Sequence, residues 1–587
     1  MNRYLGLIPC ISLTVIAFPV MIRAETSFYL AYPPTGHTTT AEQIFFIGTA
    51  PTAAEVSIND QVITRSEQGH FAPSLPLKIG ENRFILRYQD QTIERVITRI
   101  PTQVEIPTDL AFGEDSLTPN TDITRLRDEL VCFGAIAPDH ANVSVEIGGQ
   151  TISLFPQSEQ RELVPNQAIY TPISEYNLTA SRGYYQGCTT FTETGFLGHP
   201  IFKLNWRDRQ LVETGKSKIT IVALQDLGVI RIKSDRAVTR TGPGTDYSRL
   251  TPLPEGTRAR VTAKEGEWLR LDYGFWVKET ETQTIPQAIP PQSAIRVVTT
   301  RKSPGQTEII FPLEIPIPLT IQQGDDTLTL TLYNTIAQTD TIRFDDHPWI
   351  QRLDWQQITP NQVQYQLRFK TNQQWGYDYR YEQNNLILSI NHPPRITQQS
   401  LLPLQNITIV LDPGHGGKES GARGPTGYPE KEINLLISQL LAQKLRQKGA
   451  TVYLTREDDR ELSLQERVDF IAKINPTIAL SIHYNALPDG GDALNTMGVS
   501  TFWYHPQAHS LAVFIHNHLV NKLQRPDYGI YWNNLALTRP QQVPTILLEL
   551  GFLINPVEFE WITNPEAQYQ LVDSLSEAIA LWFSQLE

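Results

Sequence analysis

Three polar side chains follow apolar, strand-like runs in the C-terminal part of the chain. His415 comes directly after "ITIVLDPG", His483 ends "ALSIH", and Glu549 lies near the end of "TILLEL". Open α/β sheets bind ligands at the carboxyl ends of their strands, so we expect these side chains to meet at one edge of a sheet. Glu430, in "GYPEKEINL", opens the helix expected after a glycine-rich loop, where a carboxylate also suits the helix dipole.

The segment "GHGGKESG" around His415 could serve a phosphate, a nucleophile or a metal ion. It lacks the Gly-Lys-Ser/Thr ending of a phosphate-binding loop, and the chain has no G-x-S-x-G nucleophile elbow. Two histidines and a carboxylate, with a second carboxylate nearby, are the composition of a catalytic zinc site that keeps one position open for water. The residue types therefore predict metal-assisted hydrolysis.

The elements that must position these residues alternate between strands and helices. Apolar residues recur at helical spacing from Ile433 to Leu445, and the pattern stops at Gly449. Strands that alternate with helices predict an α/β domain with a mostly parallel sheet flanked by helices. The strand-like runs are "ITIVL", "TVYLT", "TIALSI", "VSTFWY" and "TILLEL".

Several motifs in this region resemble those of the zinc-dependent N-acetylmuramoyl-L-alanine amidases of the AmiC-like (amidase_3) type. They are "VLDPGHGGKESGA", "GYPEKEINL", "TREDD", "LQERV", "SIHYNA" and "VPTILLELGFLINP", in this order. The resemblance implies that His415, Glu430 and His483 bind Zn²⁺ and that Glu549 is the catalytic carboxylate. It also implies peptidoglycan as the substrate, cut between N-acetylmuramic acid and L-alanine of the stem peptide. Glu419 stands where the family more often has aspartate.

Substrate contacts are expected at four further positions. Gly416 and Gly417 would let a bulky glycan approach without side-chain obstruction. Asn485 lies two residues after the second histidine of the motif, and Arg456 could hold a substrate carboxylate. For Arg456 and Arg467 alike, a structural ion pair with a neighbouring acid such as Asp459 is the favoured alternative.

Two other functions remain open at this point. A zinc peptidase that acts on peptidoglycan cross-links would need the same ligands, and an inactive wall-binding scaffold would use only the N-terminal part. In some relatives a long helix inserted after the second zinc histidine blocks the metal, whereas only "YNALPDGGDALNTM" separates His483 from Gly498 here. This predicts a catalytic domain that is constitutively open, with the N-terminal modules acting through localisation.

The bulk composition indicates several domains and argues against nucleic acid as a partner. The chain has 587 residues, a net charge of −13 and a pI near 5.5. This length is several times that of an ordinary domain. No long Lys/Arg block provides the basic surface of a nucleic-acid binder.

Residues 1–24 predict a secretory signal peptide, because "MNR" precedes an apolar stretch that ends in "IRA". A retained membrane anchor is the alternative, but Pro9 and Pro19 interrupt the stretch. No other run predicts a membrane span, so the protein is expected to be exported to the periplasm or cell wall. Cys132 and Cys188 then remain, and in an exported chain they are expected to form a disulfide.

The N-terminal two thirds are expected to be β-modules. "APTAAEVS" recurs as "APDHANVS" before similar hairpin patterns, which indicates two β-sandwiches. The segment that contains "RTGPGTDY", Trp268 and Trp276 resembles the bacterial SH3-like module, and the segment after it resembles the AMIN targeting domain. Such modules imply binding to peptidoglycan or to cell-division and wall-targeting proteins. The predicted organisation is signal peptide 1–24, β-sandwiches 25–105 and 106–225, SH3-like domain 229–280, AMIN-like domain 290–392, linker 393–405 and catalytic domain 406–587.

Overall fold

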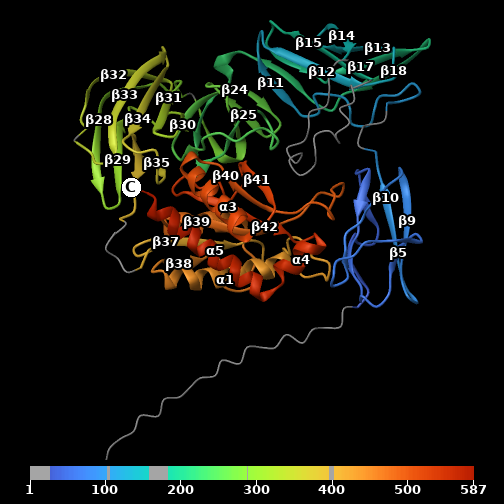
Figure 1. Cartoon of the computed structure of the whole chain (residues 1–587). Coiled ribbons are helices and arrows are strands. Elements are labelled where there is room, and N and C mark those ends of the chain that lie inside the picture. The colour runs from blue at the N-terminus through green and yellow to red at the C-terminus, as the bar shows by residue number, and fades with distance from the viewer. Residues whose placement is uncertain are drawn as a thin grey trace, which may run out of the picture.

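The computed structural model of the chain describes residues 27–101, 106–157, 183–286, 288–344, 346–395 and 402–586. The predicted signal peptide and residues 396–401 of the predicted linker lie outside these ranges. Four groups of strands precede a C-terminal α/β domain, as Figure 1 shows. No helix in the described ranges has both the length and the apolar character needed to cross a bilayer.

The α/β domain contains a six-stranded sheet of order β38-β37-β39-β42-β40-β41. The pairs β37/β38, β37/β39 and β39/β42 are parallel, whereas β40 runs antiparallel to β42. The predicted mostly parallel sheet is therefore present, and β41 is a strand that the sequence patterns did not indicate. The strands are β37 (Thr408–Pro413), β38 (Thr451–Leu454), β39 (Ile478–Asn485), β40 (Val499–Trp503), β41 (Asp527–Trp532) and β42 (Thr545–Phe552).

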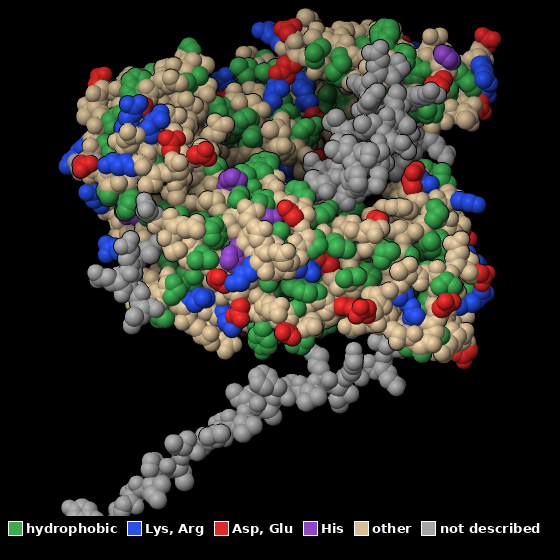
Figure 2. Space-filling model, in the orientation of Figure 1, with side chains coloured by type: hydrophobic (Ala, Val, Ile, Leu, Met, Phe, Trp, Pro, Cys, Tyr) green, Lys and Arg blue, Asp and Glu red, His purple; other side chains and the backbone are tan. Residues whose placement is uncertain are grey.

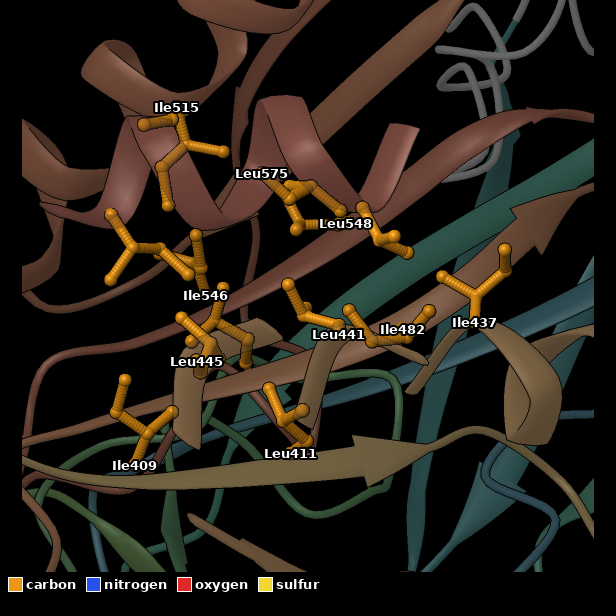
Figure 3. Close-up of a cluster of buried hydrophobic side chains, with 14 of the residues drawn as sticks. Ile409, Leu411, Ile437, Leu441, Leu445, Ile482, Ile515, Ile546, Leu548 and Leu575 are labelled. Atoms are coloured by element: carbon orange, nitrogen blue, oxygen red, sulfur yellow. The ribbon is translucent and has the colours of Figure 1, made fainter. Parts of the chain in front are cut away.

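Helices cover both faces of this sheet because its central strands are apolar on both sides. Alternate residues such as Ile409 and Leu411 face the larger core, in which α1, α3 and α5 pack (Figure 3). Val410, which points to the other face, packs with Ile471 of α2. The helices are α1 (Glu430–Gln447), α2 (Leu464–Ile474), α3 (His509–Leu523), α4 (Pro556–Ile562) and α5 (Pro565–Ser584).

The first β-module contains three small sheets and lies against the α/β domain near α4 (Figure 1). Its β5–β6 hairpin turns at Asn59 and Asp60, which both have positive φ, as a two-residue hairpin turn requires. The strands are β1 (Tyr29–Tyr32), β2 (His37–Thr39), β3 (Gln43–Phe45), β4 (Ile47–Thr49), β5 (Val56–Ile58), β6 (Gln61–Val62), β7 (His70–Phe71), β8 (Ser74–Pro76), β9 (Gly80–Tyr88) and β10 (Gln91–Arg99).

The second β-module has a six-stranded sheet, and the disulfide between Cys132 and Cys188 joins its neighbouring strands β12 and β15. The hairpin of the second repeat turns at Gly148 and Gly149, so both repeats build the same kind of turn. The strands are β11 (Ile123–Leu126), β12 (Leu130–Ile136), β13 (Asn142–Ile147), β14 (Gln150–Pro156), β15 (Tyr184–Thr190), β16 (Gly195–Gly198), β17 (Ile201–Trp206), β18 (Arg209–Thr214) and β19 (Ile219–Val222).

The second and third β-modules share one sheet, which differs from the expected separation into domains at residues 225–229. Strand β11 of the second module pairs with β24 of the third, so that β16, β19 and β11 continue into the third module. The strands of the third module are β20 (Val229–Ile232), β21 (Arg236–Ala237), β22 (Thr239–Arg240), β23 (Leu253–Pro254), β24 (Arg258–Glu265), β25 (Trp268–Leu271), β26 (Trp276–Lys278) and β27 (Thr282–Ile285).

The fourth β-module is a sandwich of a five-stranded and a four-stranded sheet around its own core. Trp375 stacks on Phe583 of α5 with ring centroids 6.1 Å apart, which fixes this module to the α/β domain. The strands are β28 (Ser293–Ser303), β29 (Gln306–Pro312), β30 (Leu319–Gln323), β31 (Thr327–Tyr333), β32 (Thr335–Ile342), β33 (Ile350–Thr359), β34 (Gln362–Phe369), β35 (Tyr377–Glu382) and β36 (Asn385–Asn391).

Candidate metal centre

The polar side chains singled out in the sequence meet at the carboxyl edge of the sheet. His415 lies two residues after the end of β37, and His483 and Glu549 are paired neighbours on β39 and β42. Glu430 is the first residue of α1, which follows the glycine-rich loop. One nitrogen of each histidine and one carboxylate oxygen of Glu430 all lie within 4.8 Å of one another.

Glu430 is the centre of this group and is almost fully buried, with 3% of its surface exposed. Its Oε2 lies 3.1 Å from His415 Nε2, and its Oε1 lies 3.0 Å from His483 Nδ1. The backbone N–H groups of Ala422 and Tyr484 also donate to the carboxylate, at 2.9 and 3.1 Å. These donors fix the carboxylate in one orientation, which a metal ligand requires.

The local charges favour an ionised Glu430. Burial opposes ionisation, but hydrogen bonds with His415 and His483 hold the pKa of Glu430 well below its usual range. Burial likewise opposes a charged His415, yet the neighbouring Glu430 and Glu419 raise the pKa of this histidine. The Glu430 carboxylate thus balances the positive charge of the neighbouring histidines. It would balance the charge of a metal cation between the two imidazoles in the same way.

Glu419 has a more direct place in the site than the sequence suggested. Its Oε1 lies 3.2 Å from His415 Nδ1, on the side of the ring opposite Glu430. A carboxylate that accepts from the second nitrogen of a ligating histidine sets its tautomer and orientation. His415 itself has φ of 59°, an uncommon value for a residue other than glycine, so its backbone must be held by its neighbours.

Glu549 lies beside this group without joining it. Its Oε2 is buried and has no hydrogen-bond partner among the described residues. Burial, together with the negative charge of Glu430, raises the pKa of Glu549 well above the ordinary value for a glutamic acid. A carboxyl group with a raised pKa and a free oxygen is suited to carrying a proton.

A cavity of about 460 Å³ opens over these side chains. His415, Glu430, His483 and Glu549 line it, together with Ala422 and the segment from Asn485 to Pro488. Asn485 was expected to contact substrate, and its buried Nδ2 has no partner within the described part of the chain. An unpaired donor at the wall of a cavity is suited to a ligand carbonyl.

Arg456 is not among the residues that line the cavity, so it does not fit the expected role as a substrate contact. It is 1% exposed, and its guanidinium donates to the carbonyls of Pro413 and Gly414 at 3.0 and 2.9 Å. The proposed partner Asp459 instead pairs with Lys431 at 2.6 Å. Arg456 therefore holds the backbone on which His415 is mounted.

Gly416 and Gly417 also have a different role from the one expected. A Cβ at Gly416 would lie 2.3 Å from the carbonyl oxygen of Arg460, so this glycine allows the loop to pack on its neighbour. The glycines that face the site are Gly414 and Gly421. A Cβ at Gly414 would lie 2.1 Å from the His483 ring, and one at Gly421 would lie 2.3 Å from Glu430 Oε2.

A buried ion pair that sequence reasoning did not identify supports the same loop. Arg467 donates to Asp412 Oδ1 at 2.8 Å, to the Pro413 carbonyl at 2.7 Å and to the His415 carbonyl at 2.7 Å. Ser481 and Thr455 donate to the same Asp412 carboxylate. Asp412 lies in the motif "LDPGH" and Arg467 in "LQERV", but only the fold shows that the two residues meet.

The comparisons with known proteins concern this domain. Residues 409–581 match the family model described as N-acetylmuramoyl-L-alanine amidase. The probable cell wall amidase LytH of Staphylococcus aureus is 35% identical over 184 residues, which cover 31% of this chain and 60% of that protein. The chain thus spans about three fifths of the length of this curated relative.

Two solved amidase structures are similar to about three tenths of the chain. AmiC2 of Nostoc punctiforme is 28% identical with a TM-score of 0.29, covering 30% of this chain and 98% of that chain. An N-acetylmuramoyl-L-alanine amidase from Clostridium difficile 630 is 32% identical with a TM-score of 0.29, covering 31% and 98%. The range matched by the family model contains all four side chains of the candidate centre.

Proposed function

We propose that this chain is a zinc-dependent peptidoglycan hydrolase that cleaves the amide between N-acetylmuramic acid and L-alanine of the stem peptide. The observation that carries the proposal is the convergence of His415, Glu430 and His483 beside the unpartnered carboxyl of Glu549. Two imidazoles and one carboxylate are a donor set that Zn²⁺ accepts, and three protein ligands leave a position for water. The match of residues 409–581 to the amidase family supports the choice of bond.

The residues divide the chemistry among them. Zinc, when bound by His415, Glu430 and His483, supplies a Lewis acid for the amide carbonyl and lowers the pKa of a bound water. Glu549 takes a proton from the attacking water and delivers it to the leaving amine of L-alanine. Asn485 donates its free Nδ2 hydrogen to a carbonyl of the substrate and thereby orients it.

The β-modules extend this proposal to location and partners. We assign the third module to the bacterial SH3-like type and the fourth to the AMIN-like type, on the sequence motifs that each carries. In the third module Arg240 donates to the carbonyls of Thr245 and Tyr247, which closes the turn of the "GPGT" motif. The modules would bind peptidoglycan or wall-targeting and cell-division proteins outside the cytoplasm, in the periplasm or cell wall.

The surface charge agrees with a wall polymer rather than nucleic acid as the ligand. On the face drawn in Figure 2, acidic and basic side chains alternate without a continuous basic stripe. The net charge of −13 has the same sign as a nucleic-acid backbone. Binding of the modules to peptidoglycan would therefore depend on specific contacts more than on long-range attraction.

Mass spectrometry of muropeptides after digestion of purified peptidoglycan tests the function. The proposal predicts free peptides that begin with L-alanine and glycan strands without peptides. A zinc peptidase would instead open cross-links and leave the peptides on the glycan. A wall-binding scaffold would release neither product and would contain no zinc by elemental analysis, so both of these results contradict the proposal.

A further inference from the structure

The first β-module contacts the two loops that form the walls of the catalytic cavity. One loop, residues 414–429, joins β37 to α1 and contributes Gly421 and Ala422 to the cavity lining. The other, residues 486–498, joins β39 to β40 and contributes Ala486, Leu487 and Pro488. Both loops lack helix and strand of their own, so their conformation depends on what they pack against.

A polar cluster attaches the module to the 486–498 loop. Asp489 accepts a short hydrogen bond from the Tyr32 hydroxyl, and its Oδ2 lies 2.8 Å from His37 Nε2. Burial opposes ionisation of Asp489, but hydrogen bonds with Thr39, Tyr32 and His37 hold its pKa below the usual range. Two further side chains of the module bind the residues that follow Asp489. Gln43 donates to the Gly490 carbonyl at 2.7 Å, and Ser74 donates to the Gly491 carbonyl at 3.1 Å.

An apolar cluster lies beside these polar contacts. It joins three residues of the module, Phe45, Ile47 and Ala72, to residues of the α/β domain. The residues on the α/β side are Leu487, Ala493, Phe552 and Ile554, with Ala422 and Tyr528 packed against them. Leu487 and Ala422 therefore belong both to this cluster and to the lining of the cavity.

The module reaches the 414–429 loop as well. A Cβ at Gly427 would lie 3.0 Å from the Tyr29 hydroxyl, which shows how closely the Tyr29 ring covers this backbone. His70 packs edge-on against Phe559 of α4 at 5.1 Å, and Glu560 accepts a hydrogen bond from the Gln68 backbone at 2.8 Å. The module therefore contacts both loops and α4.

These contacts leave the cavity open. Its lining residues all belong to the α/β domain, and none comes from the described part of the first β-module. A module that plugged the site would place its own side chains in the cavity. The arrangement is that of a support behind the cavity walls.

We propose that the first β-module is a positioning element of the catalytic unit, which holds the 414–429 and 486–498 loops in the conformation that shapes the cavity. Asp489 is the positioning residue through which Tyr32 and His37 act on the second loop. This inference rests on the proposed function, because activity is its readout. It replaces the expectation that the N-terminal modules act only through localisation.

Asp489→Ala in the full chain tests the attachment. The variant should lose about 10- to 100-fold in kcat/KM on peptidoglycan, mainly through KM, because a wall displaced by about 1 Å misplaces the substrate. Its zinc content should equal that of the unchanged chain. Asp60→Ala is the matched control, since this exposed aspartate pairs with Arg87 within the module and should leave activity unchanged.

A disulfide between module and loop separates positioning from simple loss of stability. A Cβ at Gly490 would lie 3.5 Å from the Ala41 Cβ, which is within the range of a disulfide. In the Asp489→Ala chain, the added pair Ala41→Cys and Gly490→Cys should restore at least half of the lost activity when oxidised and lose it again on reduction. The unchanged chain under the same reductant corrects for any effect on the Cys132–Cys188 disulfide.

Three results would overturn the inference while the proposed function stands. They are full activity of Asp489→Ala, no recovery in the cross-linked Asp489→Ala chain, and loss of activity when the cross-link is made in the otherwise unchanged chain. The last result would mean that the module must leave for turnover. If the unchanged chain itself released no peptides beginning with L-alanine, the proposed function would have failed instead.

Discussion

Two pairs of histidines in this chain differ in the group that lies between them. In the candidate metal centre, His415 and His483 flank the Glu430 carboxylate, with ring centroids 4.9 Å apart. In the fourth β-module, His347 and His392 flank the Thr307 hydroxyl at 2.7 and 2.8 Å, with ring centroids 5.6 Å apart.

The hydrogen bonds of the second pair fix its protonation. His347 Nδ1 accepts from the backbone N–H groups of Trp349 and Ile350, so its ring proton is on Nε2 and points to Thr307. The hydroxyl then donates to His392 Nε2. Burial lowers the pKa of both histidines, so this pair stays neutral, whereas carboxylates raise the pKa of His415.

The comparison shows that two adjacent histidines do not define a metal site by themselves. A buried anion between them provides the charge that a cation needs, and a hydroxyl provides only a hydrogen-bond relay. The carboxylate therefore suits the first pair to the proposed metal site, whereas the hydroxyl links the second pair within its own module. Four measurements test this distinction.

Removing the anion should have the largest effect. Glu430→Ala deletes the acceptor shared by both histidines, so zinc content and amidase activity should fall together to background. Zinc stoichiometry and turnover on purified peptidoglycan measure this. Glu432→Ala, an exposed position on the same helix, is the control. A Glu430→Ala chain with full zinc would show that this carboxylate is not a ligand.

Changing the neighbouring carboxyl should separate metal binding from proton transfer. Glu549→Gln keeps the shape of the side chain but cannot shuttle a proton, so turnover should fall by roughly 10²- to 10⁴-fold with zinc retained. Glu566→Gln, at an exposed glutamate in α5, controls for the loss of a charge. If Glu549→Gln lost its zinc, Glu549 would have to be counted among the ligands.

Breaking the hydroxyl relay should affect stability and leave chemistry intact. Thr307→Val removes the partner of one buried and one half-buried imidazole, which should lower the free energy of unfolding by about 1–3 kcal/mol. Denaturant unfolding measures this change, with amidase activity per folded molecule expected to stay constant. Thr341→Val, at an exposed threonine of the same module, should change stability little. Zinc bound at this second pair would contradict the comparison.

The smallest effect should be a pH dependence of stability from the neutral pair. The folded-state pKa of His392 is lowered by burial, so the unfolded chain binds its proton more readily. Its contribution to stability is present above the ordinary histidine pKa of about 6.5 and is lost as the pH falls through the folded-state value. His392→Gln should therefore lose less thermal stability than the unchanged chain between pH 7 and pH 5. Equal losses would show that this histidine does not titrate on unfolding.

The candidate site residues were easier to place from the sequence than the residues that support them. His415, His483 and Glu549 could be placed at one sheet edge because strand ends are visible in apolar runs. The Asp412–Arg467 pair was not identified, because its members are 55 positions apart and their contact depends on how α2 packs on the sheet. Arg456 was expected to hold a substrate carboxylate or to pair with an acid such as Asp459, because nothing local shows that its guanidinium binds backbone carbonyls.

Contacts between modules were the least predictable part of the fold. The hairpins of the two repeats were predicted correctly, because their Asn-Asp and Gly-Gly turns depend on local backbone preferences. The seat of the first module on the cavity loops depends instead on complementary surfaces far apart in sequence, such as Tyr32 and Asp489. Strand β41 was missed because the glycine in "DYGIYW" interrupts its apolar alternation.

The sheet shared by the second and third modules has a consequence for how such chains diversify. Backbone pairing of β11 with β24, reinforced by ion pairs of Arg125 with Glu265 and of Arg270 with Glu129, crosses the boundary between them. A recombination event that replaced one module alone would leave a row of backbone groups without partners. We expect the two modules to be inherited, duplicated and exchanged between genes as one block, with viable crossover points before β11 or after β27.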